Sequence, residues 1–168
     1  SDSGFVLCGE TYSFGNGGAD AYVVRTNKNG DTLWTRAVGG DSADIAYHII
    51  LYNDSTYLFA GESNSSGKGS SDVYFGTLNK QGTVFPTQTY GSTKKDVGYW
   101  IEKISDGNVV IVGSTDSVPL GGTIGKTNEY ILKISEKGVY QWDHDFGTVS
   151  NDIIYAVKEK SNGELLTI

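Results

Sequence analysis

The sequence predicts an all-β protein built from a repeated four-stranded antiparallel unit. Glycines recur at an interval of about 52 residues, as in Gly9, Gly61 and Gly113, and a period of this size is typical of stacked repeats. Short runs of β-branched and aromatic residues lie between the glycines, which favours strands. The 168 residues include 23 Gly and 11 Tyr but no Met, a composition that suits short strands joined by tight turns.

The first strand of each unit follows a recurring aspartate. A tyrosine comes three residues after each aspartate, as in Asp44 and Tyr47. We expect the aspartate carboxylate to accept hydrogen bonds from backbone amides of the turn that enters the strand, rather than to bind calcium or take part in catalysis. The three aspartates are Asp44, Asp96 and Asp152, and the strands that we predict after them are residues 45–50, 97–101 and 153–157.

The second strand of each unit is the most apolar, and a glycine closes it. A continuous apolar run predicts burial on both faces of a strand. A buried helix can also be apolar throughout, but these runs are short and bounded by glycine, which favours a strand. The predicted second strands are residues 5–8, 57–60 and 109–112.

The third and fourth strands are joined by a turn that ends in glycine, as in Asn29-Gly30, and such pairs suit hairpins because glycine accepts positive φ. The fourth strand is the most polar, and in the second unit it contains Pro86. Proline lacks an amide donor and is tolerated mainly at a sheet edge, so we place the fourth strand outermost. The predicted third strands are residues 21–24, 73–76 and 129–132, and the predicted fourth strands are residues 32–36, 84–88 and 140–144.

Four-stranded antiparallel blades repeated around an axis form a β-propeller. We therefore expect one segment, residues 1–168, that forms an arc of about three blades and starts and ends within a blade. Since propellers typically have four to eight blades, we expect either an excised arc of a larger propeller or a chain that completes its ring by association. The expected parts are a partial blade at 1–40, blades at 44–92 and 96–148, and a partial blade at 152–168.

Several motifs recur at fixed places in the unit. Asp-Gly-Asn at 106–108 precedes a second strand, and Gly-Ser-Thr at 113–115 follows it. Asp-Val-Tyr at 72–74 opens a third strand, Asn29-Gly30 with Trp34 marks the next turn, and residues 39–44 lead into the following unit. With these pieces the chain resembles, over nearly its whole length, the bacterial seven-bladed β-propeller repeats of secreted and surface proteins. The resemblance implies an extracellular or cell-surface location, and it implies no activity because this fold hosts many functions.

Charge and hydropathy exclude two classes of partner. The net charge of −7 repels phosphate backbones and anionic lipid, so we expect no nucleic acid partner. No apolar run reaches the length of a membrane span, so we expect no membrane insertion. No signal peptide is visible in this chain.

Chemically reactive groups do not recur with the repeat. Cys8 is the single cysteine, and it aligns with Ala60 and Val112, which predicts a small buried side chain. His48 and His144 lie in different units, and His144 should face away from the acids beside it because alternate residues of a strand point to opposite faces. We therefore predict no catalytic residues, no cofactor and no metal site.

Binding residues are expected in the loops between the second and third strands, because these loops vary most from unit to unit. Variable loops on a rigid scaffold are common places for binding. Tyr12 and Phe14 are the aromatic residues of the first such loop, and they are the candidate binding residues.

The expected function is a non-enzymatic binding or structural module of a secreted or cell-surface propeller protein, with an unknown protein or glycan as partner. Two alternatives stay open. The chain could be a fragment of a carbohydrate-active propeller enzyme whose site needs missing blades. It could also be a self-assembling fragment that completes its ring through open strand edges.

Overall fold

The computed structural model describes residues 3–117, 127–148 and 150–168, and strands are the regular secondary structure of these residues. The all-β class is therefore confirmed. None of the described residues belongs to a helix that is long and apolar enough to cross a membrane. The strands are β1 (Val6–Thr11), β2 (Asp20–Thr26), β3 (Thr32–Val38), β4 (Asp44–Asn53), β5 (Thr56–Ser63), β6 (Asp72–Asn79), β7 (Gln88–Tyr90), β8 (Asp96–Lys103), β9 (Val109–Thr115), β10 (Asn128–Ile134), β11 (Tyr140–Phe146), β12 (Val157–Glu159) and β13 (Leu165–Thr167).

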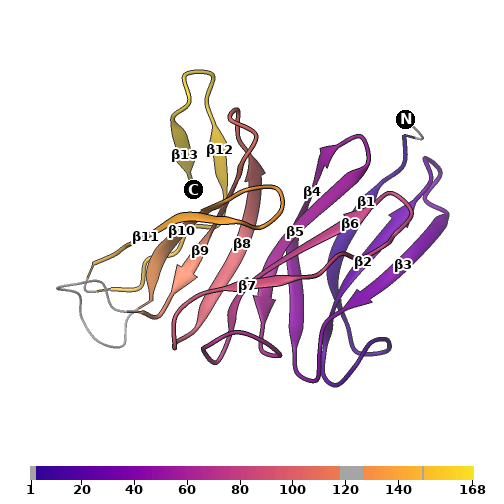
Figure 1. The fold of residues 1–168 in the computed structure, drawn as a ribbon, viewed down its shortest axis with the longest axis horizontal. Coiled ribbons are helices and arrows are strands. Elements are labelled where there is room, and N and C mark those ends of the chain that lie inside the picture. The colour runs from indigo at the N-terminus through magenta and orange to yellow at the C-terminus, as the bar shows by residue number, and fades with distance from the viewer. Residues whose placement is uncertain (1–2, 118–126, 149) are drawn as a thin grey trace.

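The strands form separate antiparallel sheets in which neighbours along the chain are neighbours in the sheet. The orders are β1-β2-β3, β4-β5-β6-β7, β8-β9-β10-β11 and β12-β13. The sheets follow one another across the molecule in chain order (Figure 1), and β8, the first strand of its sheet, contacts both β4 and β12. The repeated four-stranded antiparallel unit is thus present in the two middle sheets.

The fourth strand of the second sheet is shorter than the predicted 84–88 and lies later in the chain, so that the two share only Gln88. β7 covers Gln88–Tyr90 alone, and before it only Val84 forms an isolated bridge, to Leu78. Pro86 lies between these two pairings and has no amide hydrogen to donate, which interrupts the ladder. β12 begins at Val157, the last residue of the predicted strand 153–157, and before it the Ile154 amide donates to Gly113 O in the neighbouring sheet (3.3 Å).

Burial of the second strands depends on the sheet that precedes them. β5 and β9 are buried on both faces, as predicted. The same prediction is wrong for the first unit, where Phe5, just before β1, and Leu7 of β1 are 59% and 51% exposed. Their counterparts Tyr57 and Phe59 are buried in the cluster between the first and second sheets. No described sheet precedes β1, so its outer face has nothing packed on it.

Apolar clusters hold each sheet against the next. Val23 of β2 and Phe59 of β5 belong to the cluster between the first two sheets, and Phe75 and Ile111 belong to the cluster between the second and third. All four side chains are almost fully buried. Each such side chain contributes roughly 1.5–3 kcal/mol when it is removed from water, so these clusters fix the spacing of the sheets.

The recurring aspartates cap the turns that lead into the first strands, which confirms the sequence prediction. Oδ2 of Asp44 accepts the amide hydrogen of Gly40 at 2.8 Å, and the Asp44 amide donates to Ala19 O of the preceding sheet at 2.7 Å. The same two bonds recur in the next two turns. The carboxylates of Asp96 and Asp152 accept from Ser92 and Thr148, and their amides donate to the carbonyls of Ser71 and Thr127.

Candidate ligand-binding cleft

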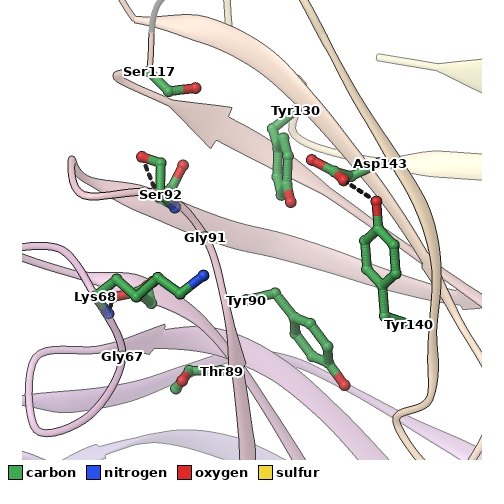
Figure 2. Close-up of a pocket in the computed structure, with 12 residues that line it drawn as sticks. Gly67, Lys68, Thr89, Tyr90, Gly91, Ser92, Ser117, Tyr130, Tyr140 and Asp143 are labelled. Atoms are coloured by element: carbon green, nitrogen blue, oxygen red, sulfur yellow. Dashed lines mark hydrogen bonds between the residues drawn. The ribbon is translucent and has the colours of Figure 1, made fainter.

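A cavity of about 550 Å³ lies between the second and third sheets. This volume is typical of sites for small molecules. Figure 2 shows Tyr90 of β7 on one side of the space and Tyr130 of β10 on the other, with Tyr140 and Asp143 of β11 beside them. Residues of two different sheets therefore form its walls.

Tyr140 and Asp143 reach the cavity together because β11 contains a bulge. Ile134 pairs with Tyr140 and Lys133 pairs with Trp142, so Gln141 is an extra residue in the ladder. The bulge allows the Tyr140 hydroxyl to donate a hydrogen bond of 2.5 Å to Oδ1 of Asp143. This hydrogen bond raises the pKa of Tyr140, so its hydroxyl stays protonated at neutral pH.

Tyr90 is fixed against the third sheet. Its hydroxyl lies 2.5 Å from Oε1 of Gln88 and also contacts the carbonyl oxygen of Gly138, in the turn before β11. Burial raises the pKa of Tyr90 to about 12. The ring is thus held as a rigid wall of the cavity by a protonated hydroxyl.

Two buried carboxylates are among the residues that line the cavity. Asp72 and Asp96 are each 1% exposed. Oδ2 of Asp72 accepts the amide hydrogens of Lys68 and Gly69, both at 2.9 Å, and Oδ2 of Asp96 accepts that of Ser92 at 2.7 Å. Burial, and to a smaller extent the charge of Asp72, raise the pKa of Asp96. Both side chains hold turns and also border the cavity.

The cavity brings together residues that depart from the repeat. Tyr130 is a repeated tyrosine, but Tyr90, Tyr140 and Asp143 are not repeated. The places of Tyr90 in the other two units are taken by Val38 and Phe146. The places of Tyr140 are taken by Thr32 and Val84, and those of Asp143 by Thr35 and Thr87.

Tyr12 and Phe14, the residues predicted to bind, lie elsewhere. They are 78% and 62% exposed in the loop between β1 and β2, and they do not line the cavity. The Phe14 ring stacks on Tyr22, with centroids 6.0 Å apart and an interplanar angle of 12°. Binding by this loop stays a prediction, and most of the corresponding third loop, residues 118–126, lies outside the described residues.

Tyr90 and Tyr140 were not among the candidate residues predicted from the sequence, and Asp143 was considered only as one of the acids beside His144, where no metal site was predicted. The sequence did contain an indication of them, because Tyr90, Tyr140 and Asp143 each differ in residue type from the residues at the aligned positions of the other units. That these three side chains line one cavity could not be predicted from the sequence, because it depends on the bulge at Gln141 and on the packing of two sheets.

The histidines and the cysteine lie apart from this cavity. The His48 ring stacks on Trp100 at 3.6 Å, and burial lowers its pKa. His144 neighbours Trp142 at 5.4 Å, on the strand face opposite to Asp143, as predicted. Cys8 is half-buried, and burial raises its pKa to about 11. Within the described ranges no group of three or more His, Cys, Asp or Glu could hold a metal ion.

Comparison with known proteins adds no family. Neither a scan against protein-family models nor a search of curated proteins finds a match to this chain. We therefore infer function from the cavity and its side chains.

Proposed function

We propose that this chain is a non-enzymatic binding module that holds a small hydroxylated ligand, of the saccharide class, in the cleft between the second and third sheets. One observation carries the proposal. Tyr90, Tyr140 and Asp143, which depart from the repeat, line the same cavity of about 550 Å³. A repeat needs the same residues in each unit for packing, so a cluster of exceptions favours a role outside packing.

The side chains of the cleft suit a sugar. Tyrosine rings offer apolar faces together with a polar hydroxyl. Asp143 accepts hydrogen bonds, the Lys68 ammonium donates them, and the hydroxyls of Thr89 and Ser92 do both. A saccharide presents apolar C–H faces and hydroxyl groups, and it can therefore use both kinds of surface.

The repetition of the buried acids and their hydrogen bonds to turn amides support a binding module rather than an enzyme. Asp72 and Asp96 are the buried carboxylates of the cleft, but Asp20 and Asp44 occupy the same places between the first and second sheets. Both pairs accept hydrogen bonds from turn amides. This repetition favours a structural role for these acids and leaves Asp143 as the acid particular to the cleft.

The wider architecture that we propose is an arc of a β-propeller, from a secreted or cell-surface protein. The tyrosines of successive first strands support it. The Tyr47 and Tyr99 rings are 5.4 Å apart, and the Tyr99 and Tyr155 rings are also 5.4 Å apart. Equal spacing is expected when each sheet is related to the next by the same rotation.

Binding in the cleft is tested by restoring the repeat residues. The variants are Tyr90→Val, Tyr140→Thr and Asp143→Thr, alone and combined, titrated against a panel of saccharides in a calorimeter. We expect the combined variant to lose binding at least tenfold. A control variant outside the cleft, Lys28→Ala at an exposed turn of the first sheet, should bind as the wild type does. Equal binding by the combined variant, or no binding of any saccharide by the wild type, would contradict the proposal.

Self-association is a second candidate, favoured by the uncovered face of the first sheet. Phe5 and Leu7 are exposed there, whereas Tyr57 and Phe59, at the same places of the second sheet, are covered by the first sheet. We propose that a second copy of this chain covers this face. Sedimentation velocity over a concentration series should show a dimer that Leu7→Lys weakens and that Lys28→Ala, a change at an exposed turn, does not. A monomer at all concentrations would contradict the idea.

A further inference from the structure

We infer that the cleft prefers a ligand with a protonated amine, an amino sugar, to a neutral or an acidic sugar. The inference rests on the proposed function and adds the chemical class of the ligand. Charge, burial and the aromatic walls of the cleft each contribute to it.

The cleft carries an excess of negative charge. Three carboxylates line it, those of Asp72, Asp96 and Asp143, against one ammonium group, that of Lys68. No ion pair joins Lys68 to any of the three within the described part of the chain. A bound ammonium group would reduce this imbalance, whereas a carboxylate on the ligand would increase it.

Burial increases the effect of this charge. Asp72 and Asp96 are almost fully buried, and charges interact more strongly where water is scarce. The raised pKa of Asp96 reports the same environment, because burial and the negative charge of Asp72 both disfavour its ionised form. A nearby positive charge favours the ionised form of a carboxyl group, so a bound amine and these carboxylates stabilise each other.

Aromatic rings form the rest of the site. Tyr90, Tyr130 and Tyr140 line the cleft, and Figure 2 shows their rings around a common space. The face of an aromatic ring attracts a cation within about 6 Å of its centroid. An amino sugar can therefore present its ammonium group to Asp143 and the rings, with the charges of the buried Asp72 and Asp96 acting from behind the wall, while its hydroxyl groups bond to Thr89 and Ser92.

The space between the first and second sheets provides an internal comparison. It contains a buried acid pair, Asp20 and Asp44, but has Val38 in place of Tyr90 and Thr87 in place of Asp143. Val38 packs there against the buried Tyr74 in an apolar cluster. The combination of a buried acid pair with Tyr90, Tyr140 and Asp143 is thus particular to the second and third sheets among those described.

Calorimetric titration of the complete chain with matched oligosaccharides tests the inference. The probes are a glucosamine trimer, the N-acetylglucosamine trimer, a glucose trimer and a glucuronate trimer, at low and high salt. We expect the glucosamine trimer to bind at least tenfold more tightly than its acetylated form, and added salt to reduce the difference.

Asp143→Asn is the central variant, because it keeps the shape of the side chain and removes its charge. It should reduce affinity for the glucosamine trimer several-fold, and by a clearly larger factor than affinity for the glucose trimer. Lys68→Gln should act in the opposite direction on the glucosamine trimer. Equal affinity for the glucosamine and N-acetylglucosamine trimers would overturn the amine preference but leave saccharide binding in place. Absence of binding by all four probes would overturn both proposals.

Discussion

The hydroxyl of Tyr140 donates a 2.5 Å hydrogen bond to Oδ1 of Asp143, although the two residues are three positions apart along one strand. In a regular strand residues three apart point to opposite faces. The bulge at Gln141 removes this alternation, so both side chains face the cleft. A local irregularity of β11 thus builds the most distinctive part of the candidate site.

Tyr140→Phe should weaken ligand binding by about three- to tenfold, because it removes one of the hydroxyl donors that orient the Asp143 carboxylate. Tyr140 is exposed and Asp143 is half-buried, so the unfolding free energy should change by less than about 1 kcal/mol. Titration calorimetry and urea unfolding measure the two quantities. A large loss of stability with unchanged binding would show that the pair is structural.

Tyr90→Phe should lower the unfolding free energy by about 1 kcal/mol, because the hydroxyl that bonds across to Gly138 is lost while the ring remains. Urea unfolding followed by tryptophan fluorescence measures the change. Tyr12→Phe is the matched control, since Tyr12 is the most exposed tyrosine of the described residues. Removal of its hydroxyl should leave the unfolding free energy unchanged. Equal stability of the two variants would contradict this role for Tyr90.

Gly61→Ala should destabilise the protein by several kcal/mol, because a Cβ at Gly61 would lie 1.8 Å from the carbonyl oxygen of Ile45 in the adjacent strand. Gly9 is its counterpart in the first unit, where a Cβ would meet nothing within 4 Å. Gly9→Ala should therefore be neutral or slightly stabilising. Thermal unfolding of the two variants checks the contrast, and similar losses of stability would show that the recurring glycines serve another purpose.

Asp20→Asn should reduce the dependence of stability on pH. Burial, and to a lesser degree the charge of Asp44, raise the pKa of Asp20. A carboxyl group with a raised pKa binds more protons in the folded than in the unfolded state. Its contribution to stability is complete below the unfolded pKa of about 3.9 and is lost as the pH rises through the folded pKa.

The variant should therefore lack this fall in stability with rising pH. Oδ1 of both Asp20 and Asp44 is buried without a hydrogen-bond partner, so an uncharged donor at position 20 is favourable. Asn128 already occupies the equivalent place in the third unit. Urea unfolding from pH 3 to pH 8, with the exposed Asp31→Asn as control, gives the test. Parallel curves for the wild type and Asp20→Asn would contradict the account.

The repeated features of the fold were predictable because each has a local cause. Glycines after the second strands mark close approach to the first strands, and Asp44, Asp96 and Asp152 cap turns within four residues of themselves. The exposure of Phe5 and Leu7 was not predictable in this way, because burial depends on what packs against a strand. The cleft was not predictable either, because Tyr90 and Asp143 meet only through the packing of two sheets.

A titration of isotopically labelled protein with the glucosamine trimer, followed by backbone amide NMR, tests the central claim most directly. The account predicts concentration-dependent shifts centred on the amides of Tyr90, Ser92 and Asp143, around the cleft between the second and third sheets. Shifts confined to the loop of Tyr12 and Phe14, or no shifts at saturating trimer, would contradict it.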